Sequence, residues 1–423
     1  MSRPQHVAIL VANLPAERDR RVIRESLSLE NAGYQVTVIA PRGDRNLRTL
    51  PGSRNVRLKP YPVPLYGSGV FSYAFEFLWS FLCISVRLLG EVLAGRAHAV
   101  QVCNPPDVYW PLALVIRALG RPWVFDHHDL CPEVYATRVG GEPNRYIYRI
   151  LEFFEWLTLR TATRVIATNE SFRDNALRRG VPEHRIVVVR NGPGRAEIAA
   201  AGAGQAAEST VHRLVYLGVL GPQDNVEGAV LAAEELARLR GRDDWRLTIA
   251  GDGETLHALQ KLVSDRGLGD VVEFTGWLDG RAVDELLLSA TVAIQPDLPT
   301  RMNHLSTMAK TVEYVARGVP VVAADLIETR RTAGNAAVYV PTGSPTEFAE
   351  AIHALLDDPA RRARMREVGL ARFAETLAWD YQARAYVAVW DELLGVHRDE
   401  SLAKAPATVD AQPVTDGQPV ARP

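Results

Sequence analysis

The most informative part of this sequence is RMNHLSTMAKTVEYVARGVPVVAADLIETR, residues 301–330. We expect an open polar loop first, then a helix, then the apolar strand VPVVAAD at 319–325, then a charged turn. Ser306 and Thr307 are good N-cap residues, so the helix is expected to open with them. A helix followed directly by a continuous apolar strand is typical of a parallel sheet covered by helices.

The same alternation of short strands and helical stretches runs along most of the chain. Six such strands are expected in the first half: HVAILV, YQVTVIA, AVQVC, PWVFDHH, RVIAT and RIVVV. The pattern breaks in the Gly/Ala-rich stretch 192–210 and then restarts with RLVYLG, WRLTIAGDG, VVEFTG, TVAIQP, VPVVAAD and AAVYV. The sequence therefore predicts an α/β protein with two doubly wound, Rossmann-like domains, whose ligand sites lie at the carboxyl ends of the strands and face a central cleft.

The domain boundaries follow from this pattern. Residues 1–192 form the first domain, 193–210 a linker, and 211–377 the second domain. The helix expected at 378–396 carries an aromatic and aliphatic stripe, and we expect it to pack back onto the first domain. Residues 398–423 are rich in Pro, Ala and Thr and lack a core pattern, so we expect them to be disordered.

Composition excludes several classes of protein. A length of 423 residues favours two domains over one core, and a formal net charge of -2 gives no support for nucleic-acid binding. The cysteines Cys83, Cys103 and Cys131 are odd in number and lack CxxC spacing, which argues against a disulfide framework and a structural zinc site. The N-terminus runs straight into a strand pattern, so no signal peptide is expected and the predicted location is the cytoplasm.

One segment, residues 69–95, is mostly apolar. Its uninterrupted run from Phe77 to Val86 is far shorter than the ~20 residues that span a bilayer. The simpler interpretation is a helix packed on the first sheet. The sharper one is a membrane-surface helix that holds the protein at the inner face of the membrane, near a lipid-linked substrate.

The residues from 306 to 313 suggest a phosphate site. A helix N-terminus presents unpaired N–H groups to phosphate oxygens, and Lys310, one turn on, adds a positive charge. Glu313 lies three residues beyond Lys310, where its carboxylate would accept hydrogen bonds from ribose hydroxyls. The spacing fits a nucleoside diphosphate lying along the helix start. An ordinary surface Lys–Glu pair remains the alternative.

A second polar group ends the strand VFDHHDL, residues 124–130. Adjacent residues of a strand point to opposite faces, so a single metal ion would rarely bind both His127 and His128. No third ligand is suitably spaced, and no metal is expected. Asp126 and Asp129 flank the histidines, which favours a hydrogen-bonding role at the sheet edge. IAGDGE, residues 249–254, allows close approach of the backbone to a ligand but lacks the full GxGxxG spacing.

The collinear order of these motifs, from RVIRESLSLENAGYQVTVIA through FDHHDL, VVVRNGPG, YLGVLGPQDNVEGAV and IAGDGE to STMAKTVEYVARGVPVVAADLIETR, resembles the GT-B glycosyltransferases. The closest match is the retaining, nucleotide-sugar-dependent glycosyltransferase family four, over residues 6 to about 396. The resemblance implies a nucleoside diphosphate sugar as donor, UDP- or GDP-linked, a hydroxyl-bearing acceptor, and no cofactor.

The resemblance also implies roles for individual residues. His128 would be the active-site histidine near the donor sugar, with Asp129 and Lys310 beside it in the catalytic set. Glu313 would bind the ribose, and Asn191 and Gly192 would lie at the interdomain hinge. The other donor-binding residues would be Gly218, Gly251, Gly253, Ser306, Thr307 and Arg301, and the acceptor side would hold Asp19, Arg21, Asp126 and His127.

The sequence departs from the family pattern at two places. The first glutamate of the family's paired motif falls on Leu305, which removes one carboxylate from sugar recognition. The diphosphate loop, residues 218–228, contains neither Arg nor Lys. Lys310, with Arg301, would then supply the positive charge.

The leading prediction is a metal-independent retaining transfer of a sugar to a hydroxyl group, in polysaccharide or glycolipid assembly. Catalysis would come mainly from positioning and from stabilising the leaving diphosphate. Decoration of a small metabolite, a nucleotide-sugar epimerase of the same fold, and a sugar-nucleotide-binding protein without turnover are the alternatives.

Overall fold

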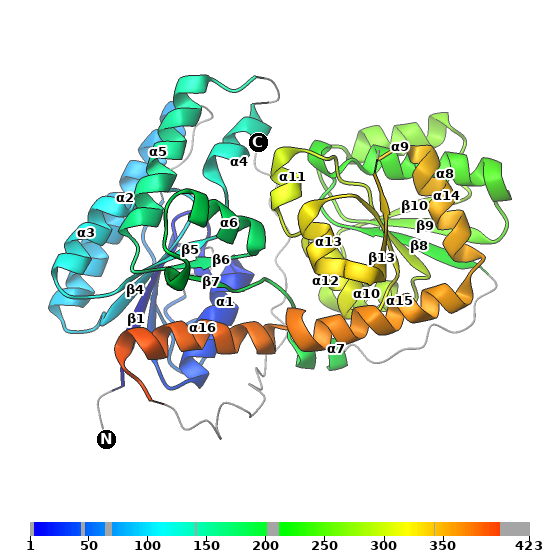
Figure 1. The fold of residues 1–423 in the computed structure, drawn as a ribbon. Coiled ribbons are helices and arrows are strands. Elements are labelled where there is room, and N and C mark those ends of the chain that lie inside the picture. The colour runs from blue at the N-terminus through cyan, green and yellow to red at the C-terminus, as the bar shows by residue number, and fades with distance from the viewer. Residues whose placement is uncertain are drawn as a thin grey trace. The chain divides into compact units, whose positions relative to one another are not determined.

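The computed structural model describes residues 4–43, 47–63, 70–139, 142–200, 211–341 and 343–397, without the side chains of 70–74. The expected tail 398–423 and the linker residues 201–210 lie outside this part of the chain. The chain divides into two compact units. Unit 1 contains the described residues up to Asn191 and those from Asp380 onward, and unit 2 contains Gly192–Trp379 (Figure 1).

Unit 1 is built on a sheet of seven parallel strands in the order β3-β2-β1-β4-β5-β6-β7. Their bounds are β1 His6–Leu10, β2 Gln35–Ile39, β3 Arg57–Leu58, β4 Ala99–Cys103, β5 Trp123–His127, β6 Arg164–Ala167 and β7 Ile186–Val188. The helices are α1 Arg20–Asn31, α2 Val70–Leu93, α3 Trp110–Ala118, α4 Cys131–Arg138, α5 Arg145–Thr161, α6 Glu170–Arg178 and α16 Trp379–Leu394.

The helices of unit 1 cover both faces of the sheet. On one face Gln101 of β4 contacts Glu25 of α1 and Tyr386 of α16, which ties the last helix to this sheet. On the other face His127 of β5 packs against Phe172 of α6. This division follows from handedness, because right-handed crossovers place α1, between β1 and β2, opposite the helices that follow β3.

Unit 2 repeats the plan with six parallel strands in the order β10-β9-β8-β11-β12-β13. The strands are β8 His212–Leu217, β9 Trp245–Ala250, β10 Val272–Gly276, β11 Val292–Gln295, β12 Val321–Ala324 and β13 Ala337–Val340. The helices are α7 Arg195–Ala200, α8 Val226–Arg240, α9 Leu256–Asp265, α10 Gly280–Leu288, α11 Arg301–Leu305, α12 Ala309–Ala316, α13 Ile327–Ala333, α14 Pro345–Leu356 and α15 Pro359–Arg372. The short helix α7 lies in the stretch where the sequence predicted a linker without periodicity.

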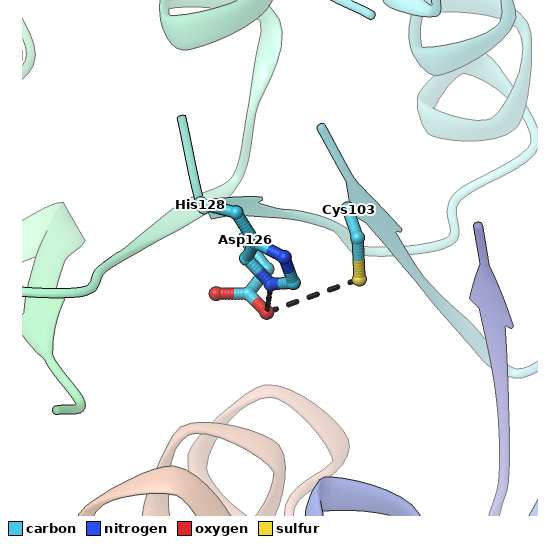
Figure 2. Close-up of side chains that lie close together, drawn as sticks. All are labelled: Cys103, Asp126 and His128. Carbon is cyan, nitrogen blue, oxygen red and sulfur yellow. Dashed lines mark hydrogen bonds and ion pairs between the residues drawn. The ribbon is translucent and has the colours of Figure 1, made fainter. Parts of the chain in front are cut away.

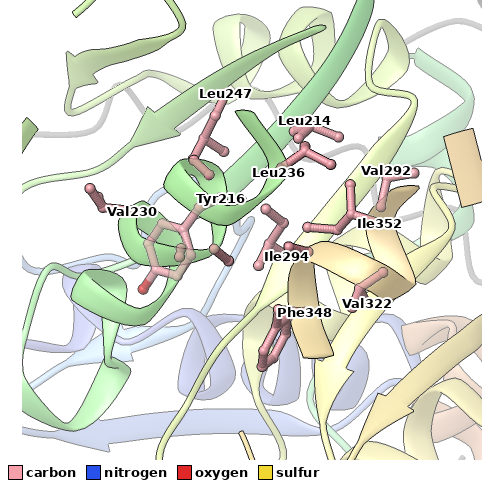
Figure 3. Packing of buried hydrophobic residues seen from close by; sticks show 14 of the residues in the cluster. Leu214, Tyr216, Val230, Leu236, Leu247, Val292, Ile294, Val322, Phe348 and Ile352 are labelled. Carbon is pink, nitrogen blue, oxygen red and sulfur yellow. The ribbon is translucent and has the colours of Figure 1, made fainter. Parts of the chain in front are cut away.

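A continuous apolar core holds unit 2 together. It joins strand residues such as Leu214 and Ile294 to Leu236 of α8 and Phe348 of α14 (Figure 3). Each large apolar side chain fully buried in this way contributes roughly 1.5–3 kcal/mol. The opposite face of the sheet is covered by a smaller cluster that includes Tyr314 of α12.

The structure corrects the expected order of elements around residue 306. Residues 301–305 form a short helix, α11, where an open loop was predicted, because Thr300 caps it by accepting a hydrogen bond from the Asn303 N–H. Ser306 is extended and ends α11. Helix α12 therefore begins at Ala309 with Met308 as its N-cap, two residues later than predicted.

Candidate functional site

A buried network of charged side chains lies at the carboxyl end of β5 in unit 1. Arg21 of α1 donates from Nε and Nη2 to the two carboxylate oxygens of Asp126, at 3.0 and 2.8 Å. Its Nε also lies 3.0 Å from Glu25 Oε1. Arg21 further donates to the backbone carbonyl of Val189 and to Asn191 Oδ1. The guanidinium is thus saturated by fixed partners, as a rigid fork of donors allows.

The protonation states in this network follow from its geometry. Although burial opposes it, the guanidinium of Arg21 and then His128 hold the pKa of Asp126 well below its usual range. Burial and the neighbouring Asp126 charge instead raise the pKa of Glu25 well above its usual range. Gln101 donates to both carboxylates, at 2.6 Å to Glu25 and 3.2 Å to Asp126. One carboxylate is therefore charged and the other is held as an acid.

His128 is the most accessible member of this group. Its Nε2 lies 2.5 Å from Asp126 Oδ2, and its side chain is 15% exposed. Burial alone would lower its pKa, but the Asp126 charge outweighs burial and raises the pKa of His128. The backbone N–H of His128 donates to Asn104 Oδ1 at 2.6 Å, which fixes the residue just after the strand. The pairing orients the ring and favours its protonated form.

His127 faces the other side of the sheet, as the strand geometry predicted. It is completely buried, with its ring 5.1 Å from that of Phe125 and 4.9 Å from that of Phe172, measured between centroids. Burial lowers the pKa of His127 to about 3. Its ring therefore stays neutral and packs between two aromatic rings of unit 1, a geometry that favours a structural role over the predicted place on the acceptor side.

The other predicted site residues of unit 1, on the acceptor side and in the catalytic set, also have structural partners. Asp19 caps α1 by accepting from the backbone N–H groups of Arg21 and Val22 at 3.1 Å. Asn104 Nδ2 donates to the backbone carbonyl of Asp129 at 2.6 Å, and burial raises the pKa of the Asp129 carboxyl. Arg21 and Asp126 bind each other inside the unit. Of these predicted residues His128 and Asp129 are partly exposed, whereas the others are buried.

Cys103, Asp126 and His128 bring one sulfur, one oxygen and one nitrogen within 4.8 Å of one another (Figure 2). Such a trio is a conceivable set of metal ligands. Both oxygens of Asp126, however, accept from the Arg21 guanidinium, which opposes a second cation beside them. Burial and the Asp126 charge also raise the pKa of the Cys103 thiol well above its usual range. The charge balance fits a hydrogen-bonded cluster better than a metal centre.

Unit 2 has a second buried charge cluster, centred on Lys310 of α12. The Lys310 Nζ lies 2.8 Å from Asp224 Oδ1 and 2.8 Å from Asp297 Oδ1, and donates to the Tyr216 hydroxyl at 3.2 Å. Burial would lower its pKa, but the two carboxylates raise it. The loop 218–228 contains neither Arg nor Lys and instead contributes Asp224, which binds the lysine predicted to supply the positive charge.

The three predicted glycines bring the loops after β8 and β9 together. A Cβ on Gly251 would lie 1.8 Å from the backbone oxygen of Gly218, and one on Gly253 would lie 2.5 Å from that of Leu220. A Cβ on Gly218 would lie 3.2 Å from Cε of Lys310. Glycine is therefore required at these positions because the two loops touch beside Lys310. The sequence analysis had explained these glycines only by a close approach of the backbone to a ligand.

The remaining predicted donor residues lie at or near the start of α12. The N-cap residue of α12, Met308, makes no side-chain cap hydrogen bond. Ser306 and Thr307 precede this turn, and Arg301 is exposed at the start of α11. Glu313 pairs with Arg317, with 2.5 Å between Oε2 and Nη1, and Arg317 also binds Asp284. Lys310 and Glu313 therefore have separate partners and are not an ordinary surface pair.

Sequence reasoning missed the polar partners that complete both clusters. Gln101 interrupts the apolar strand AVQVC, and a polar residue inside a continuous apolar strand signals a buried hydrogen-bond network. Glu25 lies one helical turn after Arg21, a spacing typical of an ion pair. Asp297 follows the end of β11 by two residues, where parallel sheets place their polar groups. No sequence pattern indicated that Tyr386 binds Gln101, because the two residues lie far apart in the sequence.

This chain is similar to proteins of known families. Two family models match: "Glycosyl transferase 4-like domain" over residues 20–192 and "Glycosyl transferases group 1" over residues 211–358. The alpha-D-kanosaminyltransferase of Streptomyces kanamyceticus is 26% identical over 370 residues, covering 82% of this chain and 89% of that protein.

Solved structures share the fold. Sucrose-phosphate synthase from Thermosynechococcus elongatus superposes with a TM-score of 0.70 at 18% identity, covering 93% of this chain and all of that chain. A protein from Anabaena, solved in complex with UDP-glucose, gives a TM-score of 0.64 at 14% identity over 92% of this chain and 99% of that chain.

Proposed function

Since the chain belongs to the GT-B glycosyltransferases of the family-four-like type, we propose that it transfers a sugar from a nucleoside diphosphate sugar, UDP- or GDP-linked, to a hydroxyl acceptor with retained anomeric configuration. The observation that carries this proposal is the buried Lys310 at the start of α12, beside the glycine-linked loops of unit 2. A lysine held at a helix start is suited to a diphosphate.

In this proposal the diphosphate takes the place of Asp224. Asp224 lies on the turn Pro222–Asp224 and its side chain is 13% exposed, whereas Asp297 is buried. The first N–H groups of α12 and Lys310 then bind the phosphate oxygens, with Ser306, Thr307 and Arg301 around them. The Glu313 carboxylate binds the ribose hydroxyls.

His128 is the proposed catalytic residue of unit 1. Its Nε2 is engaged by Asp126, so Nδ1 is the nitrogen that remains for a sugar or acceptor hydroxyl. Asp126 itself is poorly placed as a nucleophile, because both of its oxygens accept hydrogen bonds from buried donors. This supports catalysis by positioning and by stabilising the leaving diphosphate, with Asp129 as a further polar group nearby.

The transfer is proposed to be independent of a metal ion. Asp224 and Asp297 are the kind of carboxylate pair that would hold a divalent cation on a diphosphate. The Lys310 ammonium lies between them at 2.8 Å from each, so the positive charge there comes from the protein.

For the acceptor, we favour a growing polysaccharide or glycolipid at the cytoplasmic face of the membrane. Support comes from the apolar segment 69–95, whose exposed side chains would meet the membrane periphery. A small-molecule acceptor is the second candidate, because another relative from Streptomyces kanamyceticus, 25% identical over 341 residues, is named as a 2-deoxystreptamine glucosyltransferase.

The proposal is tested by incubating the chain with a panel of UDP- and GDP-sugars, with lipid-linked and small-molecule acceptors, in the presence and absence of a chelator. We expect acceptor-dependent release of the nucleoside diphosphate, unchanged by the chelator, and a product whose anomeric configuration by NMR matches the donor. An inverted product would contradict retention. Loss of turnover in chelator would contradict metal independence.

A further inference from the structure

The exposed side chains of α2 that the structure describes, from Phe75 onward, are all uncharged. Between residues 75 and 93 the exposed positions are Phe75, Leu78, Trp79, Leu82, Val86, Gly90 and Leu93. They recur at helical spacing and so form one stripe. Val86 is 70% exposed and Leu93 is 87% exposed. The solvent-exposed face of a surface helix normally carries charged residues, so an uncharged, apolar stripe of this kind indicates a binding surface.

The exposed side chains of α5 combine aromatic residues with arginines. Its exposed positions are Arg145, Tyr146, Arg149, Ile150, Phe153, Trp156 and Arg160. The guanidinium carbon of Arg145 lies 5.0 Å from the centre of the Tyr146 ring, and that of Arg160 lies 5.7 Å from the Trp156 ring. The two acidic residues of α5, Glu152 and Glu155, instead pair with Arg179. The outward side of α5 is therefore apolar and positive.

Helix α3 joins these two surfaces. It exposes Leu114, Val115 and, just past its end, Leu119. The Phe81 ring of α2 stacks on Tyr109, the N-cap residue of α3, with 5.6 Å between centroids. At the other side Arg117 of α3 donates to the backbone carbonyl of Thr161 at the end of α5 at 2.8 Å. Helix α3 therefore contacts both α5 and α2, and the three helices lie on the same side of unit 1 (Figure 1).

We propose that this surface, the three-helix face of α2, α3 and α5, binds the surface of a membrane that contains anionic lipids. Apolar and aromatic side chains would enter the boundary between headgroups and acyl chains, and arginines would reach the lipid phosphates. Among the described residues of the 70–139 and 142–200 ranges, no helix is long and apolar enough to cross a bilayer. The contact is therefore one of helices lying in the plane of the surface.

Charge favours a lipid surface over a second copy of the chain. The exposed described positions of α2, α3 and α5 include arginines but no Asp or Glu. In a symmetric dimer this face would meet itself, so its arginines would find no carboxylate on the partner's face. Anionic headgroups supply that missing charge.

The test is co-sedimentation of the full chain with vesicles of phosphatidylcholine, with and without phosphatidylglycerol. We expect binding only with phosphatidylglycerol, weakened by salt. Each arginine near an anionic surface contributes about five-fold to affinity, so Arg145→Gln with Arg149→Gln should weaken binding roughly 30-fold. Leu82→Gln with Val86→Gln should weaken it by on the order of 10-fold or more.

Arg361→Gln with Arg364→Gln is the matched control, because these two arginines are exposed on one helix of unit 2. It removes the same charge and should leave vesicle binding unchanged. Nucleoside diphosphate affinity, measured on the same variants, should not change, which separates this proposal from the donor site. The proposal would be overturned if the control pair weakened vesicle binding as much as the α5 pair does. It would also be overturned if the chain did not bind vesicles and instead formed a dimer that Leu82→Gln dissociates.

Discussion

Both units place a buried cation against two carboxyl groups at the carboxyl end of a parallel sheet, but the two clusters differ in how firmly the cation is held. In unit 1 Arg21 binds Asp126 with two hydrogen bonds, and both Asp126 and Glu25 are fully buried. In unit 2 Lys310 offers a single ammonium group, and its partner Asp224 is partly exposed on a turn. A fixed guanidinium can orient a neighbouring catalytic group, whereas a lysine with an exposed partner can exchange that partner for a ligand.

The largest effect is expected at His128, which depends on the fixed cluster. His128→Phe should lower turnover by about 10²–10⁴-fold, the range for a positioned acid–base group, while nucleotide affinity stays the same. His127→Phe is the matched control, since an apolar ring fits between Phe125 and Phe172. Steady-state kinetics with a saturating acceptor make the measurement. If His127→Phe were inactive while folded and His128→Phe were active, the roles of the two histidines would be reversed.

Arg21→Ala should mainly destabilise the protein. Removing one partner from a buried ion pair leaves an uncompensated charge and costs about 3–5 kcal/mol. Urea unfolding measures this loss, with Arg20→Ala as the control because Arg20 is exposed at the start of the same helix. A loss below about 1 kcal/mol, typical of an ordinary surface substitution, would show that the cluster of unit 1 is not fixed.

Lys310→Met should weaken nucleoside diphosphate binding by about 1.5–3 kcal/mol, because one charged hydrogen bond is lost. Calorimetric titration with UDP and GDP makes the measurement. Lys261→Met is a suitable control, since Lys261 is paired with Asp265 on an exposed part of α9. Wild-type affinity in Lys310→Met would remove Lys310 from the donor site.

Asp224→Asn tests whether the diphosphate replaces Asp224 at Lys310, and its expected effect is the smallest. If Asp224 competes with the diphosphate for Lys310, removing its charge should tighten nucleotide binding about five-fold, since a partly exposed ion pair is worth about 1 kcal/mol. Asp243→Asn, at an exposed position in the same unit, should have no effect. Weaker binding in Asp224→Asn would mean that the carboxylate helps to hold the ligand.

The fold could be predicted well from the sequence because the strands of both sheets are mostly continuous runs of apolar residues. The sequence also predicted that His127 and His128 face opposite sides, which follows from strand geometry alone. The start of α12 was predicted two residues too early because Ser306 and Thr307 are good caps in isolation, but Thr300 caps a separate helix first. The partners of Lys310 were missed because Asp224 and Asp297 lie far from it in sequence and meet it only through the sheet.

A crystal structure of the chain with UDP bound would test most directly whether Lys310 exchanges its partner Asp224 for a phosphate. We expect Nζ of Lys310 to lie about 2.7–3.2 Å from a phosphate oxygen, with Asp297 still paired and Asp224 turned away. A complex in which UDP is bound while Lys310 keeps both carboxylates, with the phosphates held by other residues, would contradict it.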